Sequence, residues 1–298
     1  MLQRRQGKAQ LSMRSAVLLM AAVAIARGSS FMFSKQLLDT IEPLNLLGIR
    51  SLIAFAVLML FFGRRVAASV RNDPGNLSAG VLIGFIYFIV MVLELNGLKH
   101  TTTATASFIE NSAIVLVPLA EGIIGHRKLS GKTLVCSGLG LAGIGFIAAR
   151  GFSQGIGIGE LLCTICAFVY TVAIIQTDRK AKKYDPFVVG ILYVGFMGIF
   201  GIAGAFMTET PHLPQTAGQW GMLLMLAVVC SSFGFAMQPV AQKTISSETT
   251  GLMTAINPLT TAVLGAFVLH EPFGVSSAIG ALLIITAIVF HNINNDQS

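Results

Sequence analysis

Five ionisable residues interrupt long apolar runs in the first half of the chain. Glu121 is predicted to lie near the cytoplasmic end of its helix in an interfacial ion pair, and the other four, predicted to share one half of the bilayer, are Arg27, Arg50, Glu94 and Glu110. A charge at the centre of a membrane-spanning helix costs at least ~2.5–3.5 kcal/mol on insertion scales, so such residues need partners or water and mark functional sites. Two of the four are basic and two are acidic, so a site that gathers them can neutralise its own charge. A site that holds both signs also suits a zwitterionic ligand.

Each of these residues has a functional and a structural interpretation. Arg27 is predicted to contact substrate. Glu110 is predicted to contact substrate or to carry a proton, and the alternative is a pairing with Arg27. Arg50 and Glu94 are predicted to serve in charge pairing or coupling. For Arg50, a structural pairing with Glu94 or Glu110 is as well supported as a ligand contact.

Long apolar helices are needed to hold these residues. Of the 298 residues, 54% are hydrophobic and only 11% are charged, against about 25% charged in soluble domains. The mean hydropathy is +0.77. A spanning helix needs roughly 20 mainly apolar residues, so the chain is predicted to be an all-α membrane protein whose longest connection is residues 63–78. The ten predicted transmembrane helices cover residues 15–33, 43–62, 79–98, 104–125, 133–149, 160–176, 186–207, 219–239, 250–269 and 275–290.

The basic residues flank the apolar segments and form no single face, so the net charge of +7 does not predict a nucleic-acid partner. With the N-terminus in the cytoplasm, fifteen Lys and Arg residues fall on the cytoplasmic side, and only Lys35, Lys99 and Arg150 fall on the other. The positive-inside rule therefore predicts this orientation in a bacterial-type inner (plasma) membrane. An even number of helices returns the C-terminus to the cytoplasm.

The sequence repeats itself in type with a shift of 143 to 144 residues. Glu42-Pro43 recurs as Asp185-Pro186, and a lysine and a histidine follow the same shift. This predicts two repeats of five helices, residues 1–150 and 151–298. Because five is odd, the second repeat enters the membrane from the opposite side. Inverted repeats of this kind are common in secondary transporters and provide two related half-structures for alternating access.

The shift pairs each charged position of the first repeat with a neutral polar position of the second. A charged binding group in the outer half of the bilayer and a neutral polar wall in the inner half are therefore predicted. The alternative for the wall is helix-to-helix hydrogen bonding, worth only about 0.6 kcal/mol on average. The counterparts are Tyr170 for Arg27, Tyr193 for Arg50, Gln238 for Glu94 and Thr254 for Glu110. The predicted substrate-binding residues are Arg27, Glu110, Asn111, Tyr170, Tyr193, Gln238 and Asn257.

Short motifs occur in order along the chain: Ser29-Ser30-Phe31, Glu42-Pro43-Leu44, Leu47-Gly48-Ile49-Arg50, Gly159-Glu160-Leu161-Leu162, Tyr184-Asp185-Pro186, Asn257-Pro258-Leu259 and His270-Glu271-Pro272. In order and spacing they resemble the EamA-type family of the drug/metabolite transporter (DMT) superfamily over essentially the whole chain. The resemblance implies ten helices around a central cavity, and export or uptake of small metabolites, amino acids often among them. Two positions depart from the family pattern: Arg27 replaces a usual tryptophan, and Gly125-His126 replaces the Gly-Glu that often ends the fourth helix.

The predicted function is secondary active or facilitative transport of a small metabolite by alternating access. An amino acid or a related zwitterion or carboxylate is favoured as substrate, and export is favoured as direction. Coupling is open between proton antiport through a carboxylate such as Glu110 and facilitated exchange. The alternatives are a carrier of lipids or lipid-linked sugars and, less favoured, an intramembrane enzyme, which would need a nucleophile and a base that the predicted spans do not supply.

No enzymatic activity, cofactor or metal site is predicted. A nucleotide-phosphate loop is missing from the sequence, and Cys163 and Cys166 have the spacing of only half a zinc site. The expected partners are the small-molecule substrate and the lipid bilayer, with a homo-oligomer left open.

Overall fold

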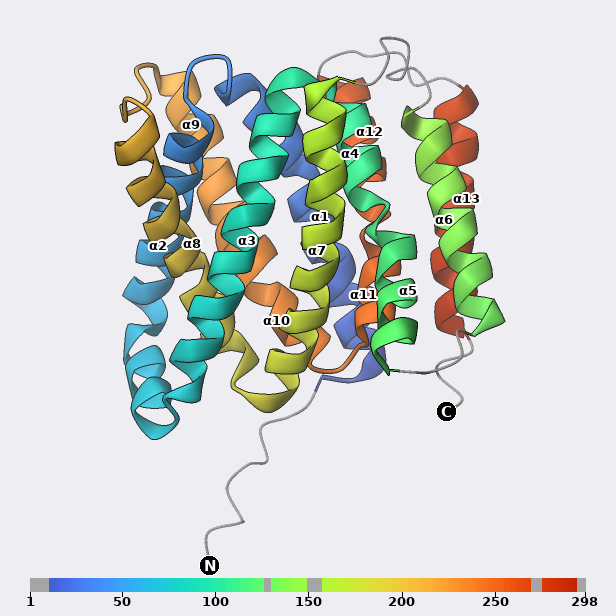
Figure 1. Cartoon of the computed structure of the whole chain (residues 1–298), viewed down its shortest axis with the longest axis horizontal. Coiled ribbons are helices and arrows are strands. Elements are labelled where there is room, and N and C mark those ends of the chain that lie inside the picture. Colours follow the sequence, from blue (N-terminus) through green and yellow to red (C-terminus); the bar gives the residue numbers. More distant parts are fainter. Residues whose placement is uncertain (1–10, 126–129, 149–156, 269–274, 294–298) are drawn as a thin grey trace, which may run out of the picture.

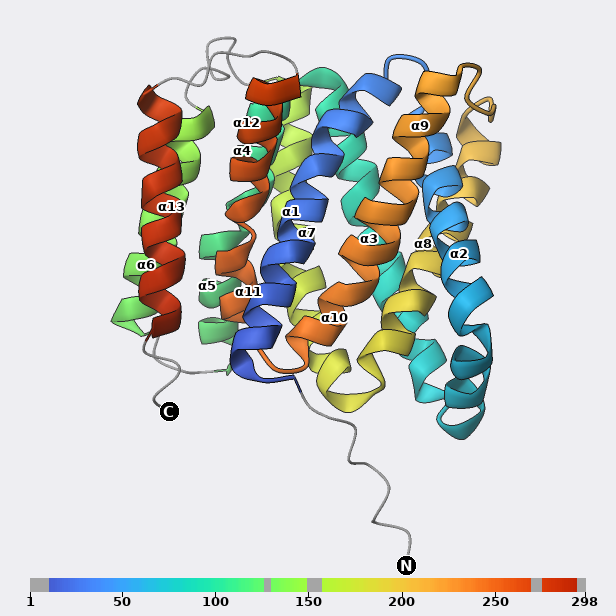
Figure 2. The same ribbon diagram turned by 180° about the vertical axis from the view of Figure 1, so that it is seen from behind.

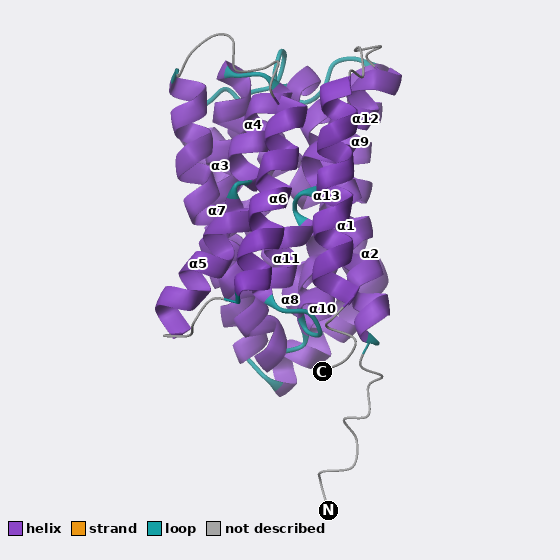
Figure 3. Cartoon of the chain, turned by 90° about the vertical axis from the view of Figure 1, so that its right-hand side faces the viewer, coloured by secondary structure: helices purple, strands orange, loops and turns teal. Residues whose placement is uncertain are grey.

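The computed structural model describes residues 11–125, 130–148, 157–268 and 275–293. The regular elements of these residues are all helical, and Figure 3 shows no strand among them. The elements are α1 (Met13–Leu37), α2 (Pro43–Asn72), α3 (Gly75–His100), α4 (Thr103–Asn111), α5 (Ala113–Gly125), α6 (Gly131–Ala148), α7 (Ile158–Lys183), α8 (Pro186–Thr208), α9 (Ala217–Met225), the π-helical segment η2 (Leu226–Phe235), α10 (Ala236–Gln242), α11 (Ser247–Met253), α12 (Ile256–Val268) and α13 (Val275–Ile293).

Seven helical stretches of the described residues are long and apolar enough to cross a membrane. Two of them are composite, one made of α4 and α5 and one running from α9 through η2 to α10. Two shorter apolar helices, Gly131–Phe146 and Ala278–His291, accompany them. Apart from breaks at Ser112 and at Thr254–Ala255, the described residues of the ten segments predicted from the sequence are helical. The chain is therefore an all-helical, multi-pass membrane protein. The inverted relation of its two halves stays a prediction.

The predicted connection over residues 63–78 is wrong in its extent, because most of it is helical. α2 continues to Asn72 and α3 begins at Gly75, so only Asp73 and Pro74 connect them. Pro74 has no backbone N–H to continue a helix, and the Asp73 Oδ1 accepts a hydrogen bond from the Gly75 N–H at 2.8 Å. The arginines of this segment are exposed. A charged helix end of this kind extends beyond the apolar layer into water.

α1 begins and α13 ends at the same face of the bundle, at the bottom of Figure 1. This face is named the N-terminal face, and the other is the opposite face. α1 runs along the inside of the bundle against α12 and η2, while α3 packs on α7 and α8. α6 and α13 pack mainly on each other at one edge, as the view from behind shows (Figure 2). The four charged residues singled out from the sequence lie one each on α1, α2, α3 and α4.

α2 and α8 pack against each other through glycines that let their backbones touch. A Cβ atom on Gly48 would lie 2.7 Å from the backbone nitrogen of Ile202, and one on Gly201 would lie 2.9 Å from the backbone nitrogen of Gly48. Such distances leave no room for a side chain. Small residues allow close helix contacts in membranes, where lipid removes most of the hydrophobic drive for association.

Residues near the end of each of these two helices also form polar contacts with the start of the other helix. Glu209, which follows α8, accepts hydrogen bonds from the backbone N–H groups of Leu44 at 2.9 Å and Asn45 at 2.8 Å, in the first turn of α2. Arg65, near the end of α2, forms an ion pair at 3.2 Å with Asp185, the N-cap of α8. A helix N-terminus has unpaired N–H groups and favours negative charge. The two antiparallel helices are therefore linked by hydrogen bonds at one face and by an ion pair at the other.

Candidate functional site

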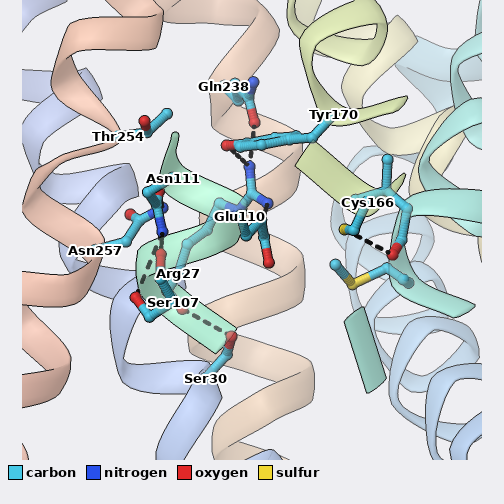
Figure 4. Close-up of polar contacts among 12 residues, drawn as sticks. Arg27, Ser30, Ser107, Glu110, Asn111, Cys166, Tyr170, Gln238, Thr254 and Asn257 are labelled. Carbon is cyan, nitrogen blue, oxygen red and sulfur yellow. Dashed lines mark hydrogen bonds and ion pairs between the residues drawn. The ribbon is translucent and has the colours of Figure 1, made fainter. Parts of the chain in front are cut away.

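Arg27 lies near the middle of α1, and its guanidinium group is the centre of the buried cluster drawn in Figure 4. The residue is 4% exposed. Its Nη1 donates to the Tyr170 hydroxyl at 2.6 Å and to Gln238 Oε1 at 3.1 Å. The guanidinium carbon lies 4.6 Å from the ring centroid of Phe235, 4.8 Å from that of Tyr170 and 5.7 Å from that of Tyr87, within cation–π range. Neutral groups from four other segments thus hold this charge.

The two acidic residues of the cluster lie on neighbouring helices. Glu110, in the last turn of α4, is 1% exposed, and Glu94, on α3, is 3% exposed. The Oε1 atom of Glu110 is 4.0 Å from the Nη2 atom of Arg27 and accepts no hydrogen bond from any described residue. The contact of Arg27 with Glu110 is therefore an ion pair without the direct hydrogen bond, of about 2.7–2.9 Å, that closes a tight pair.

Arg50 is fully buried on α2 and bonds mainly to neutral atoms. Its Nη2 donates to the Met91 sulfur at 2.8 Å and its Nη1 to the Ser34 hydroxyl at 3.4 Å. A thioether sulfur is a weak acceptor, so these contacts balance little of the positive charge. The predicted pairing of Arg50 with Glu94 or Glu110 stays a prediction.

Asn111 and Asn257 meet where two helices are interrupted. Asn111 ends α4 and Asn257 is the second residue of α12. The Asn257 Nδ2 donates to Asn111 Oδ1 at 2.9 Å, and the Asn111 Nδ2 donates to the Ser107 carbonyl at 2.7 Å. Pro258 accounts for the second break, because it lacks the N–H that would bond the Thr254 carbonyl one turn earlier. In Figure 4 these two asparagines bond to each other beside Arg27, and not to its guanidinium group.

Tyr193 lies in an aromatic layer behind the rings that contact Arg27. Its ring stacks on Tyr87 with centroids 5.1 Å apart, and its hydroxyl donates to the backbone carbonyl of Phe235. Tyr193 therefore supports the rings around the guanidinium group, and its own hydroxyl is already used.

Tyr87 and Phe235 are site residues that the sequence interpretation missed. Tyr87 could have been found, because it lies seven residues before Glu94 on the same helix face and is one of only four tyrosines in the chain. Phe235 is one of twenty phenylalanines, most of them in apolar helices, and nothing in the sequence distinguishes it.

The cluster continues toward the N-terminal face through two buried amides. The Gln238 Nε2 donates to Gln242 Oε1 at 3.3 Å, and the Gln242 Nε2 donates to the Ile174 carbonyl at 3.0 Å. Every ionisable member of the cluster is at most 4% exposed, so this conformation is closed to both faces. Chemically, the arrangement offers a fixed guanidinium donor, aromatic walls and a carboxyl pair, which is suited to binding an anionic or zwitterionic small molecule.

A model of the EamA-like transporter family matches residues 14–149 and again residues 157–293. An uncharacterised transporter of Archaeoglobus fulgidus is 27% identical and aligns over 91% of this chain and 95% of the relative. The uncharacterised transporter YvbV of Bacillus subtilis is 25% identical, over 95% and 93%. The biotin transporter of Escherichia coli is 21% identical, over 74% and 75%. One solved crystal structure is similar with a TM-score of 0.79 at 18% identity, covering 96% of this chain and 100% of the other, which shows a shared fold.

Proposed function

Because the chain belongs to the EamA-like transporter family, we propose that it carries a small metabolite across the membrane by alternating access and binds the metabolite's carboxylate at Arg27. An amino acid or a related zwitterion or carboxylate is the substrate class, and export is the favoured direction. The relatives at 19–21% identity that are named biotin transporters act on a molecule that itself has a carboxylate. Biotin is therefore one useful probe for this site.

The observation that best supports the proposal is the loose ion pair between Arg27 and Glu110. Its Nη2 lies 4.0 Å from Glu110, too far for a hydrogen bond, while Nη1 is fixed by Tyr170 and Gln238. A substrate carboxylate can accept a hydrogen bond from Nη2 at about 2.7–2.9 Å without first breaking a tight charged pair. Tyr87 and the other rings around it exclude water, which strengthens such a contact.

Access to the closed site requires helices to move. The breaks between α4 and α5 and between α11 and α12, beside the site, can serve as hinges. α4 and α5 meet at Ser112, and α11 and α12 meet at Thr254–Ala255. Residues at the ends of elements commonly absorb the backbone changes of hinge motions. The proposed inverted repeat would allow related motions to open either face. We assign the N-terminal face to the cytoplasm of a bacterial-type inner membrane, because it holds most of the Lys and Arg residues.

Ligand-induced stabilisation of the purified protein in detergent tests the site. The probes are biotin, lactate, alanine and tetraethylammonium. A ligand at about 100 times its Kd stabilises by ~2.7 kcal/mol, which raises the unfolding midpoint. We expect a carboxylate to stabilise the wild-type protein, the effect to vanish in Arg27→Gln, and a weaker effect to remain in Arg27→Lys, which keeps the charge but loses the planar guanidinium fork.

Arg65→Gln is the matched control, because the Arg65 side chain is 45% exposed and lies at the N-terminal face. Its ligand response should equal that of the wild-type protein. A carboxylate response that survives in Arg27→Gln contradicts the assigned binding group. Stabilisation by tetraethylammonium alone, or only by added lipids, contradicts the carboxylate class and favours a cation or lipid carrier.

A further inference from the structure

Arg50 is a fully buried cation whose contacts in the structure do not balance its charge. Its Nη2 donates to the Met91 sulfur, a weak acceptor, and its Nη1 donates to the Ser34 hydroxyl at the long distance of 3.4 Å. Its Nε has no hydrogen-bond partner among the described residues, and the ion pairs of this part of the chain do not include Arg50. Burying an ionised group costs much free energy unless an opposite charge accompanies it. This guanidinium group therefore has room for an anionic partner.

The residues that Arg50 contacts lie beyond Arg27 in the direction of the opposite face. On α1, Ser34 follows Arg27 by seven residues, which is two turns on the same side of the helix and about 10 Å along its axis. On α3, Met91 follows Tyr87, whose ring contacts Arg27, by four residues, or about 6 Å. Both helices run from the N-terminal face to the opposite face (Figure 1). The two buried guanidinium groups thus follow one another along the bundle.

A third cation continues this order. Lys35 follows Ser34 on α1, and its Nζ donates to the backbone carbonyls of Leu98 at 2.6 Å and Thr101 at 3.0 Å, at the end of α3. Leu98 lies seven residues after Met91, so these carbonyls are about 10 Å nearer to the opposite face. Arg27, Arg50 and Lys35 form a line of cations, named the cationic line, from the middle of the bundle to the opposite face.

Glu94 is the acidic residue beside this line. It lies three residues after Met91 on the same side of α3 and is 3% exposed. Its negative charge opposes an anion at Arg50, which makes Arg50 a weaker anion-binding position than its own charge alone would give. A position on a transport route has to bind its ligand strongly enough to receive it and weakly enough to release it.

We propose that Arg50 is a second binding position for the substrate carboxylate, which moves between Arg27 and Arg50 on its way between the central site and the opposite face. The inference rests on the function proposed above, because it takes the carboxylate at Arg27 as its starting point. The cationic line marks the route, between α1, α2 and α3. A carboxylate on this route exchanges one guanidinium partner for the next, so it avoids the high cost of an unpaired charge in an apolar interior.

Binding and transport of lactate and biotin, measured separately, test this role. Binding is titrated in detergent, and the maximal rate of exchange of the radiolabelled carboxylate is measured at saturation in proteoliposomes. A lower maximal rate with binding retained indicates a step after binding. Arg50→Gln should therefore lower the maximal rate about tenfold or more and still bind the carboxylate, whereas Arg27→Gln should lose binding. Arg64→Gln, an exposed arginine of the same helix α2, should behave as the wild-type protein.

Arg50→Lys keeps the positive charge and should keep more of the maximal rate than Arg50→Gln, but less than the wild-type protein. An unchanged maximal rate in Arg50→Gln overturns the second position. Loss of binding in Arg50→Gln, as in Arg27→Gln, overturns it as well, because Arg50 would then belong to the central site. Carboxylate binding that survives in Arg27→Gln, or no binding of either probe to the wild-type protein, contradicts the proposed function itself.

Glu94→Gln separates this role from a purely structural pairing with Arg50, and it does not depend on whether Arg50→Gln folds. The substitution removes the negative charge that opposes the anion and leaves Arg50 in place, so the Kd of lactate and biotin should fall. If Arg50 serves only to pair with Glu94, either substitution breaks the same pair and leaves one buried charge without its partner. Unchanged or weaker binding in Glu94→Gln, together with a lower unfolding midpoint, would therefore overturn the inference and leave the binding role of Arg27 intact.

Discussion

The guanidinium group of Arg27 is buried mainly by groups that carry no charge, and this determines how strongly it can bind a ligand. A bidentate carboxylate partner would neutralise it and would have to be displaced by substrate. Tyr170 and Gln238 satisfy Nη1 and orient the group, while Glu110 approaches Nη2 only to 4.0 Å. The arginine is therefore fixed in place while one of its donors remains available.

Removal of the Tyr170 hydroxyl tests this account of the residue. Tyr170→Phe keeps the ring 4.8 Å from the guanidinium carbon but removes the acceptor at 2.6 Å. Hydrogen bonds to charged groups contribute roughly 1.5–3 kcal/mol, so the unfolding midpoint should fall and carboxylate affinity should fall about tenfold or more. Thermal unfolding and ligand titration measure both effects. Tyr184→Phe, a tyrosine at the N-terminal face, is the control, and equal behaviour of the two variants would contradict the role of the Tyr170 hydroxyl.

At the residue scale, the repeat shift drew attention to positions that are distant in the chain. Arg27 and its counterpart Tyr170 are 143 residues apart and hydrogen-bond in the structure, a contact that the sequence interpretation did not predict. Tyr193 shows the limit of predicting contacts from the sequence. Its hydroxyl donates to a backbone carbonyl, and no pattern of side chains reveals which backbone group a buried hydroxyl will reach.

Among the elements, the α2–α8 pair has a close backbone contact, and Gly48 makes it possible. Gly48→Ala places a Cβ 2.7 Å from the backbone of Ile202, where no flexible side chain can move aside. Overpacking of this kind typically costs about 1–3 kcal/mol, so the unfolding midpoint in detergent should fall. Gly138→Ala on α6 is the matched control, since its Cβ would meet nothing within 4 Å and alanine is about 0.5–1 kcal/mol more favourable than glycine inside a helix. Equal or opposite effects would disprove the tight α2–α8 contact.

The connection between α8 and α9 is sensitive to pH through His212. Its Nδ1 lies 3.1 Å from the Thr210 carbonyl and its Nε2 lies 2.9 Å from the Thr40 carbonyl. A neutral imidazole can donate from only one nitrogen, so the carbonyls of Thr210 and, next, Thr40 raise the pKa of His212 above its ordinary 6.5. The resulting stabilisation is complete below pH 6.5 and is lost as the pH rises through the higher folded-state pKa.

His212→Gln should therefore remove a component of stability that the wild-type protein has at low pH and loses at higher pH. Unfolding midpoints measured across this range for both proteins test the effect. His100→Gln, at the same face, is the control. A difference between wild type and His212→Gln that is constant with pH would show that His212 does not titrate in this way.

The element boundaries illustrate what hydropathy alone can and cannot predict. The apolar part of α2 was predicted, but its charged extension to Asn72 was not, because hydropathy measures where a helix leaves the apolar layer and not where it ends. Pro74 marks the true end. Pro118 and Pro258 predict irregularities in the fourth and ninth predicted helices, but the residues at which these helices break, Ser112 and Thr254, could be identified only from the structure.

At the scale of the whole molecule, the position of the two faces would determine which way each half of the proposed transport cycle opens. The turn between α2 and α3 lies at the face where α1 begins, and the connection between α8 and α9 lies at the opposite face. The sequence predicts fifteen Lys and Arg residues for the first face and three for the other, so we expect from the positive-inside rule that the first face is the cytoplasmic one. Single cysteines at exposed positions of each face can test this, because the four native cysteines are buried and should give little background.

Arg71→Cys, at the N-terminal face, and Gln215→Cys, at the opposite face, are suitable because both native residues are exposed. A maleimide that does not cross membranes should label Gln215→Cys in intact cells and Arg71→Cys only after the cells are opened. The unsubstituted protein gives the background, and equal labelling of both variants in opened cells shows that both thiols are reactive. The reverse pattern would invert the orientation, and outward flux of substrate would then start from the face that carries His212. Labelling of both positions from one side would contradict the arrangement of the two faces.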